Sequence, residues 1–198
     1  MESKAELHGL ILSGGHSRRM GRDKGLIRTD SVAWVNRAGA LLESLDLPVS
    51  IMVREAQLAD YQTEVYPNFE LLSDQDLIVG GPLKGLLSFH QHYPQKDVLV
   101  LPCDMPNVTK AVLIDLLNFR VQNPFHDVWV YKVGGRVQPF PGVYAATCLA
   151  KIYRQLQLDS MSKICLMDAV NNGKTAILES DHSVAEAFTN ANFPEDIG

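Results

Sequence analysis

A glycine-rich, basic segment from Leu12 to Lys24 contains the side chains best suited to chemistry. Gly14 and Gly15 follow an apolar run, where backbone amides can approach a phosphate without a Cβ in the way, and Ser17 can add a hydroxyl donor. The segment has a local charge of +3, from the four cations Arg18, Arg19, Arg22 and Lys24 against the one anion Asp23. Because the whole chain has a formal net charge of −5, basic charge is concentrated here, and the segment is predicted to bind an anion.

The spacing of this segment matches neither of two well-known phosphate loops. The Walker A pattern G-x-x-x-x-G-K-[ST] fails because five residues separate Gly15 from Gly21 and Arg22 follows. The dinucleotide fingerprint G-x-G-x-x-G is not met either. A surface turn with solvated arginines is the simpler interpretation, but the position directly after an expected strand favours a ligand loop.

A second candidate is Asp104, which comes directly after the apolar run 98–101 and Pro102-Cys103. A carboxylate at the end of a buried strand is a candidate ligand for Mg²⁺, which takes one or two carboxylates together with phosphate oxygens. The alternative is a turn or helix-capping aspartate, because Asp-x-Pro is also turn chemistry. Cys103 is expected to pack rather than react. His90 and His92 are expected to be ordinary surface histidines, because a spacing of two on a helix points the rings apart.

Alternating apolar runs and helical patterns must position these residues. Strands are predicted at 7–13, 49–53, 70–72 and 98–101, and helices at 33–45 with Ser31 as N-cap, at 81–93 with Pro82 in the first turn, and from Thr109 to about Arg120. This alternation predicts an α/β fold, a mostly parallel twisted sheet with helices on both faces and ligands at the carboxyl ends of the strands.

The pattern changes after residue 125. Gly134-Gly135 between the apolar runs 128–133 and 137–140 predicts a β-hairpin, expected as a small insertion beside the site at about 128–144. Helices near 145–156 and 162–171 and strands at 175–178 and 184–188 complete the chain. With 198 residues and no repeat or linker, the sequence predicts a single domain over 1–198.

Composition excludes several classes of protein. The 18 basic and 23 acidic residues provide no general attraction to nucleic acid or to an anionic membrane. The three cysteines match neither a disulfide framework nor a zinc site. The charged start Met1–Glu6 does not resemble a signal peptide. No apolar run approaches the ~18 residues of a membrane-spanning helix. We therefore expect a cytoplasmic protein with neither a nucleic-acid nor a membrane partner.

The segment Leu12–Lys24 resembles the signature L-[AS]-G-G-x-S-x-R-M-G-x-D-K of the molybdenum cofactor guanylyltransferases, within the nucleotidyltransferases that include the sugar-nucleotide pyrophosphorylases. Ser13 replaces the commoner alanine. The resemblance implies a Rossmann-like nucleotidyltransferase fold, GTP as substrate and Mg²⁺ as cofactor. It implies catalytic roles for Lys24, Arg19 and Asp104, with Asp104 as metal ligand. It implies nucleotide binding by Leu12, Ser13, Gly14, Gly15, Lys24, Asp74, Gly81 and Asp104.

Three further segments carry the resemblance. Pro102–Pro106 matches the metal motif of the family, and Asp74 matches its aspartate near the base, ahead of a G-P-L-x-G turn in which Lys84 replaces the usual alanine. Two segments, 136–144 and 188–196, resemble acceptor-side motifs and imply acceptor binding by Arg136, Gln138, Asn190 and Asn192. The asparagine that usually follows the second strand is missing, and no role is assigned to Arg54 in its place.

The reaction implied by the resemblance is attack by the terminal phosphate of molybdopterin on the α-phosphorus of GTP. It forms a guanine dinucleotide cofactor and releases pyrophosphate, and the implied partners are the other proteins of molybdenum cofactor synthesis and the apo-molybdoenzymes. Three alternatives stay open: a molybdopterin cytidylyltransferase, a sugar-1-phosphate nucleotidyltransferase, and a non-catalytic module that binds GTP or the cofactor. The G-P-L-x-G turn at 81–85 argues against the cytidylyltransferase, and the short chain argues against the sugar-1-phosphate nucleotidyltransferase. The presence of both Lys24 and Asp104 argues against a non-catalytic module.

Overall fold

The computed structural model describes residues 5–14, 23–158, 164–180 and 182–191. Its strands are β1 Leu7–Leu12, β2 Arg28–Thr29, β3 Val32–Ala33, β4 Val49–Val53, β5 Glu70–Ser73, β6 Asp97–Pro102, β7 Val128–Val133, β8 Arg136–Tyr144 and β9 Thr175–Ser180. Its α-helices are α1 Trp34–Glu43, α2 Leu58–Glu64, α3 Gly81–His92, α4 Lys110–Gln122, α5 Ala146–Leu158 and α6 Leu166–Asn172. Three 3₁₀ helices are η1 Lys24–Leu26, η2 Glu55–Gln57 and η3 His182–Phe188.

A seven-stranded sheet in the order β5-β4-β1-β6-β8-β7-β9 forms the centre of the described chain, and β2 and β3 form a separate small hairpin. β5, β4, β1 and β6 run parallel, so their carboxyl ends meet at one edge. β8 is antiparallel to both β6 and β7, and β7 is parallel to β9. The predicted α/β class with a mostly parallel sheet is confirmed. The predicted hairpin also forms, but it is not a small insertion, because its strands β7 and β8 are part of the central sheet.

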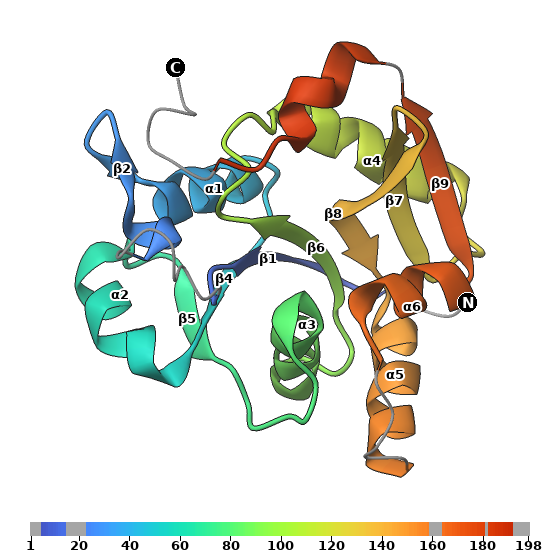
Figure 1. Cartoon of the computed structure of the whole chain (residues 1–198), viewed down its shortest axis with the longest axis horizontal. Helices are drawn as coiled ribbons and strands as arrows, with labels where there is room; N and C mark the ends of the chain where they lie inside the picture. The colour runs from blue at the N-terminus through green and yellow to red at the C-terminus, as the bar shows by residue number, and fades with distance from the viewer. Residues whose placement is uncertain (1–4, 15–22, 159–163, 181, 192–198) are drawn as a thin grey trace.

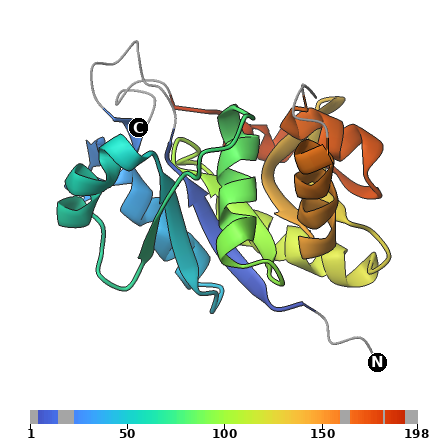
Figure 2. The same ribbon diagram turned by 90° about the horizontal axis from the view of Figure 1, so that it is seen from below.

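Helices cover both faces of the sheet. α1 and α4 lie on one face, and α3, α5 and α6 lie on the other (Figures 1 and 2). The core strands β4 and β6 are apolar almost throughout and buried on both sides, as expected for parallel strands between two helical layers. Among the described residues, no helix is long and apolar enough to cross a membrane.

Local signals explain several element boundaries. Pro82 lies in the first turn of α3, where its missing N–H costs no hydrogen bond. The hydroxyl of Thr109 caps α4 by accepting from the Val112 amide at 3.4 Å. Gly134 and Gly135 turn the β7–β8 hairpin with φ of 55° and 78°.

Three expectations were wrong. Ser31 is not the N-cap of α1, because it turns the β2–β3 hairpin with φ of 67°, and Ala33 occupies the cap position. Residues 184–188 form part of η3 and not a strand. In this helical turn Phe188 packs edge-on against Tyr131. His90 is buried at 6% exposure within α3, not at the surface, whereas His92 is exposed.

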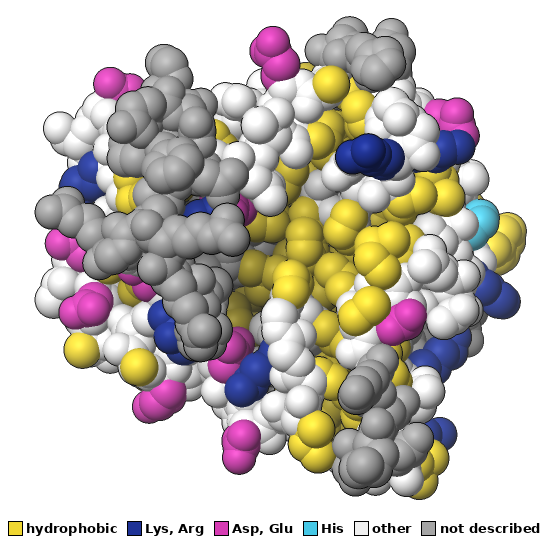
Figure 3. Space-filling model, in the orientation of Figure 1, with side chains coloured by type: hydrophobic (Ala, Val, Ile, Leu, Met, Phe, Trp, Pro, Cys, Tyr) yellow, Lys and Arg dark blue, Asp and Glu magenta, His cyan; other side chains and the backbone are white. Residues whose placement is uncertain are grey.

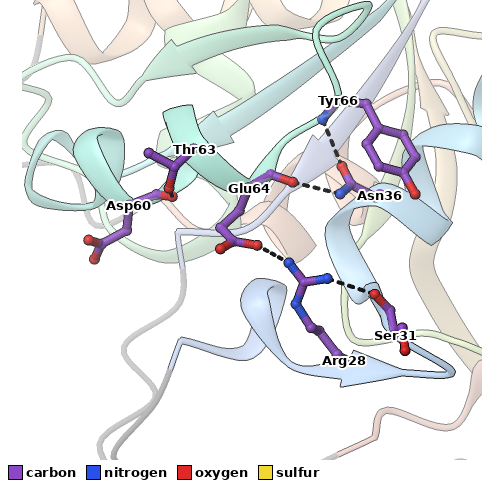
Figure 4. Close-up of polar contacts among 7 residues, drawn as sticks. All are labelled: Arg28, Ser31, Asn36, Asp60, Thr63, Glu64 and Tyr66. Atoms are coloured by element: carbon purple, nitrogen blue, oxygen red, sulfur yellow. Dashed lines mark hydrogen bonds and ion pairs between the residues drawn. The ribbon is translucent and has the colours of Figure 1, made fainter.

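Polar contacts hold α2 against α1 and the β2–β3 hairpin (Figure 4). The Asn36 side chain donates to the Glu64 carbonyl at 2.8 Å and accepts from the Tyr66 amide at 3.1 Å. Arg28 forms an ion pair with Glu64 and donates to the Ser31 carbonyl at 2.6 Å. These contacts fix where α2 lies, and therefore where the side chains on its inner face point.

Candidate active site

A cavity of about 920 Å³ lies at the carboxyl edge of the parallel strands. Each of four strands contributes the residues that follow its end: Gly14 after β1, Arg54 after β4, Asp74 after β5 and Asp104 after β6. The first turn of α3 completes one wall with Gly81, whose φ of 63° favours glycine. Hydrophobic side chains gather across the middle of the face shown in Figure 3, over the junction of β6 and β8. A ligand at this edge therefore meets both charged groups and apolar surface.

Lys24 and Asp104 meet in this cavity, although 80 residues separate them in the chain. The Lys24 ammonium donates to Asp104 Oδ2 at 3.0 Å and to the Ala191 carbonyl at 3.2 Å. Both side chains are about one-fifth exposed, at 23% and 20%. The pair is thus accessible to a ligand and still sheltered enough for its charges to act strongly on one.

Asp74 lies near the loop that follows β1 and near the N-terminal part of α3. A Cβ at Gly14 or Gly85 would lie 3.5 Å and 3.8 Å, respectively, from its carboxylate oxygens, which are ordinary contact distances, so both residues pack beside Asp74. Burial raises the pKa of Asp74, and the positive charges of Lys84 and Arg54 oppose that rise. The carboxylate is therefore a desolvated acceptor with two cations nearby. Its neighbour Asp76 is exposed.

The predicted nucleotide residues that the structure describes come together here. Leu12, Ser13, Gly14, Lys24, Asp74, Gly81 and Asp104 all line the cavity. Of the predicted acceptor residues, Asn190 lines it and Arg136 and Gln138 do not. Arg136 is exposed at the start of β8, opposite Val133 at the end of β7. Because β8 runs antiparallel to β6, its start lies at the same edge of the sheet as the carboxyl ends of the parallel strands, but Arg136 is outside the cavity lining. Gly15, Arg19 and Asn192 lie outside the described residues.

A further group of polar residues at and beneath the site was not predicted from the sequence. Arg54 lines the cavity, and the signal that could have found it is the one used for Asp104: a charged residue directly after a buried strand. Gln57 and Tyr61 are both buried and contact Asp23, the residue before Lys24. Their positions in a short helical segment gave no sign of this contact.

Cys103, as expected, is a packing residue. Burial raises the pKa of its thiol to about 12, and the adjacent Asp104 carboxylate adds to the rise. A thiol with such a pKa stays protonated at neutral pH and is a poor nucleophile.

Backbone amides and cations at the carboxyl edge of a parallel sheet are how α/β proteins bind nucleotides, and this fold and site define a protein of that class. The chain belongs to the MobA-like NTP transferase family, whose domain model matches residues 9–170. The match runs from β1 into α6 and so includes every described residue of the candidate site except Asn190 and Ala191.

The chain is also similar to two named relatives and, in its fold, to a solved structure. The chain is 28% identical over 189 residues to a protein of Methanothermobacter thermautotrophicus named "Probable molybdenum cofactor guanylyltransferase", covering 94% of this chain and 95% of that protein. It is 30% identical over 194 residues to a protein of the same name from Pelotomaculum thermopropionicum, covering 96% and 89%. The crystal structure of molybdopterin-guanine dinucleotide biosynthesis protein A from Archaeoglobus fulgidus superposes with a TM-score of 0.73 at 18% identity, covering 96% of this chain and 94% of that one.

Proposed function

We propose that this protein transfers GMP from GTP to the terminal phosphate of molybdopterin, forming molybdopterin guanine dinucleotide and releasing pyrophosphate. The observation that carries the proposal is the Lys24–Asp104 pair, 3.0 Å apart in a cavity that also contains Asp74. The names of the two relatives support the choice of guanylyl transfer.

The reaction needs charge control more than proton transfer. An oxygen of the acceptor phosphate bonds to the α-phosphorus of GTP, the bond from that phosphorus to the bridging oxygen breaks, and pyrophosphate leaves. Because the attacking oxygen is already an anion, no general base is required. Catalysis then consists of aligning two polyanions that repel each other and neutralising the charge that develops on the leaving pyrophosphate. The Lys24 ammonium is suited to that neutralisation, and Arg19 is proposed to assist it.

Mg²⁺ fits this site as an ion shared with the nucleotide. Among the residues that the structure describes, no group of three His, Cys, Asp or Glu side chains could hold a metal by itself. A single carboxylate with phosphate oxygens is a usual set of ligands for Mg²⁺, so Asp104 would hold it once the triphosphate is bound. When bound, Mg²⁺ supplies positive charge to the phosphate oxygens.

Asp74 is proposed to select the base. A carboxylate can accept from both donors on the Watson–Crick edge of guanine, and a base without that donor pair would leave the desolvated carboxylate unsatisfied. Gly81 in the α3 turn and the backbone around Leu12, Ser13, Gly14 and Gly15 would hold the nucleotide beside it. We further propose Asn190 and Asn192, with Arg136 and Gln138, for the acceptor side. Of the described acceptor candidates, only Asn190 has support from the cavity.

The test is transfer of label from α-³²P-GTP with and without molybdopterin, with the four nucleotides in competition. We expect dinucleotide formation that needs molybdopterin and a GTP preference over CTP of up to ~10⁴, the scale for a site whose polar groups would otherwise be unpaired. Asp74→Asn should reduce that preference more than total turnover, and Asp76→Asn, at the exposed neighbouring acid, is the matched control. Equal use of CTP by the unaltered protein would instead establish a cytidylyltransferase, and GTP binding without product would establish a binding module.

A further inference from the structure

One hydroxyl group joins the two ends of the chain segment that precedes Lys24. The oxygen of Tyr61 lies 2.6 Å from Ser13 Oγ and 2.6 Å from Asp23 Oδ1. Ser13 directly follows β1, and Asp23 is the N-cap of η1, the turn that begins with Lys24. Tyr61 itself comes from α2 and is completely buried.

The protons in this group can be assigned. Burial, followed by the neighbouring Cys103 and Asp23, raises the pKa of Tyr61 and keeps its hydroxyl protonated. A carboxylate oxygen accepts, so Tyr61 donates its proton to Asp23 Oδ1. The Ser13 hydroxyl lies 2.6 Å from the Tyr61 oxygen and also donates to Cys103 Sγ at 3.2 Å. Hydrogen bonds in such a chain polarise and strengthen one another, above all when the last acceptor is charged.

Asp23 accepts from three directions. The Gly25 amide donates to Oδ1 at 3.1 Å, the Gln57 amide group donates to Oδ2, and Tyr61 donates to Oδ1. Only glycine fits at position 25, because a Cβ there would lie 2.1 Å from Ser13 Oγ and 2.2 Å from the Tyr61 oxygen. These three donors therefore restrain the Asp23 side chain, and Asp23 is the residue directly before Lys24 in the chain.

Contacts with α1 and the β2–β3 hairpin hold α2 in place, and this fixes the backbone position from which the Tyr61 side chain extends. Asn36 bridges the end of α2 through Glu64 and Tyr66, and Arg28 pairs with Glu64 (Figure 4). A path of contacts therefore runs from α1 through α2 and Tyr61 to Asp23, and then to the ammonium that meets Asp104.

We propose that Tyr61 is a positioning residue for nucleotidyl transfer: its hydroxyl holds Asp23, and through Asp23 it sets the direction in which Lys24 reaches Asp104 and the triphosphate. The inference rests on the proposed function, since it assumes that Lys24 acts on a triphosphate. It assigns no contact between Tyr61 and substrate.

Tyr61→Phe tests the proposal because it removes one oxygen and keeps the buried ring. We expect kcat/KM for GTP to fall on the order of tenfold, the scale for losing a hydrogen bond to a charged group. Tyr131→Phe is the matched control. It also removes a buried phenol oxygen, which donates to the Val112 carbonyl at 2.9 Å, and it should stay within about twofold of the unaltered protein.

A double-mutant cycle with Lys24→Ala separates positioning from general destabilisation. If Tyr61 acts through Lys24, Tyr61→Phe will change kcat/KM less than about twofold once Lys24 is alanine. A full tenfold loss in that background would overturn the proposal. Gln57→Met, which removes a second donor to Asp23, should show the same dependence on Lys24 and covers the case in which Tyr61→Phe does not fold.

Calorimetric titration with inorganic triphosphate gives a readout that needs no transfer reaction. Tyr61→Phe should weaken triphosphate binding several-fold when Lys24 is present and leave it unchanged in Lys24→Ala. If this pattern appears but no dinucleotide forms, the proposed function fails and the positioning role stands. If transfer occurs and triphosphate binding in Tyr61→Phe equals that of Tyr131→Phe, the positioning role fails alone.

Discussion

Asp104→Asn distinguishes a catalytic carboxylate from a structural one, because the chain contains a closely matched ion pair at the other end of the sheet. Asp127 pairs with Lys151 at 3.0 Å and is 19% exposed, and Asp104 pairs with Lys24 at 3.0 Å and is 20% exposed. The lysines differ, because Lys151 is 68% exposed and Lys24 is 23% exposed. Asp127 comes just before β7, whereas Asp104 follows β6, and β7 runs in the same direction as β6. The two aspartates are alike in their own exposure and in the distance to their lysines, and they occupy opposite ends of the strands.

The expected losses of stability are small and alike. Each substitution keeps the shape of the side chain and removes one charge from a part-exposed pair, which costs about 1 kcal/mol. For a chain of this length that corresponds to a fall in Tm of roughly 2–4 °C. Calorimetry of both variants measures it.

The expected losses of activity differ widely. Asp104→Asn should lower kcat by about 10²–10³, the scale for removing one preorganised electrostatic group, and should change the dependence of the rate on Mg²⁺ concentration. Asp127→Asn should keep kcat within about twofold of the unaltered protein. Turnover of Asp104→Asn within threefold of the unaltered protein, or an equal loss in Asp127→Asn, would refute the reasoning.

Three further predictions concern buried charge. Asp97 pairs with Arg120 and accepts from the Ala146 amide at 2.9 Å, so Asp97→Ala should cost about 3–5 kcal/mol in urea unfolding; a shift below 1 kcal/mol would contradict it. His90 Nδ1 is buried without a hydrogen-bond partner among the described residues, and burial lowers the pKa of His90. Its neutral form is favoured on folding, so stability falls as pH drops below about 6.5, and His90→Leu should raise the free energy of unfolding by about 1 kcal/mol and flatten that fall. Because burial raises the pKa of Asp74, its charge costs stability near pH 7 and less as pH falls; Asp74→Asn should therefore raise Tm at pH 7 but not at pH 4, in parallel melting curves.

The sequence predicted those parts of the fold that rest on local pattern. The runs 49–53 and 70–72 became β4 and β5 with their bounds within a residue, and Thr109 and Pro82 act as helix-start signals. Ser31 misled because serine is a favoured helix N-cap and is uncommon in the left-handed conformation that Ser31 adopts here. The β2–β3 pairing that imposes this conformation joins residues on either side of Ser31.

The candidate site was predictable where a residue follows a strand, and hidden where a contact crosses between elements. Asp104 and Asp74 could be found because parallel strands bring their carboxyl ends together. Tyr61 could not, because its partners Ser13 and Asp23 are 48 and 38 residues away and the contact depends on how α2 packs. His90 was misjudged for a similar reason: its side of α3 faces α5, where its ring lies 6.3 Å from that of Tyr153, and the helix alone does not show which face is covered.

The contacts of the Tyr61 hydroxyl with Ser13 and Asp23 also determine the stage at which the chain loses conformational entropy. Two points of the chain that both lie 2.6 Å from one oxygen have already been brought together, whatever path the residues between them take. Closing that stretch of chain costs conformational entropy, and here the cost falls on folding, when α2 packs and delivers Tyr61. A nucleotide bound, as proposed, against Gly14 and Lys24, the chain neighbours of these two points, would not have to repeat that cost, so more of its contact energy would remain as affinity.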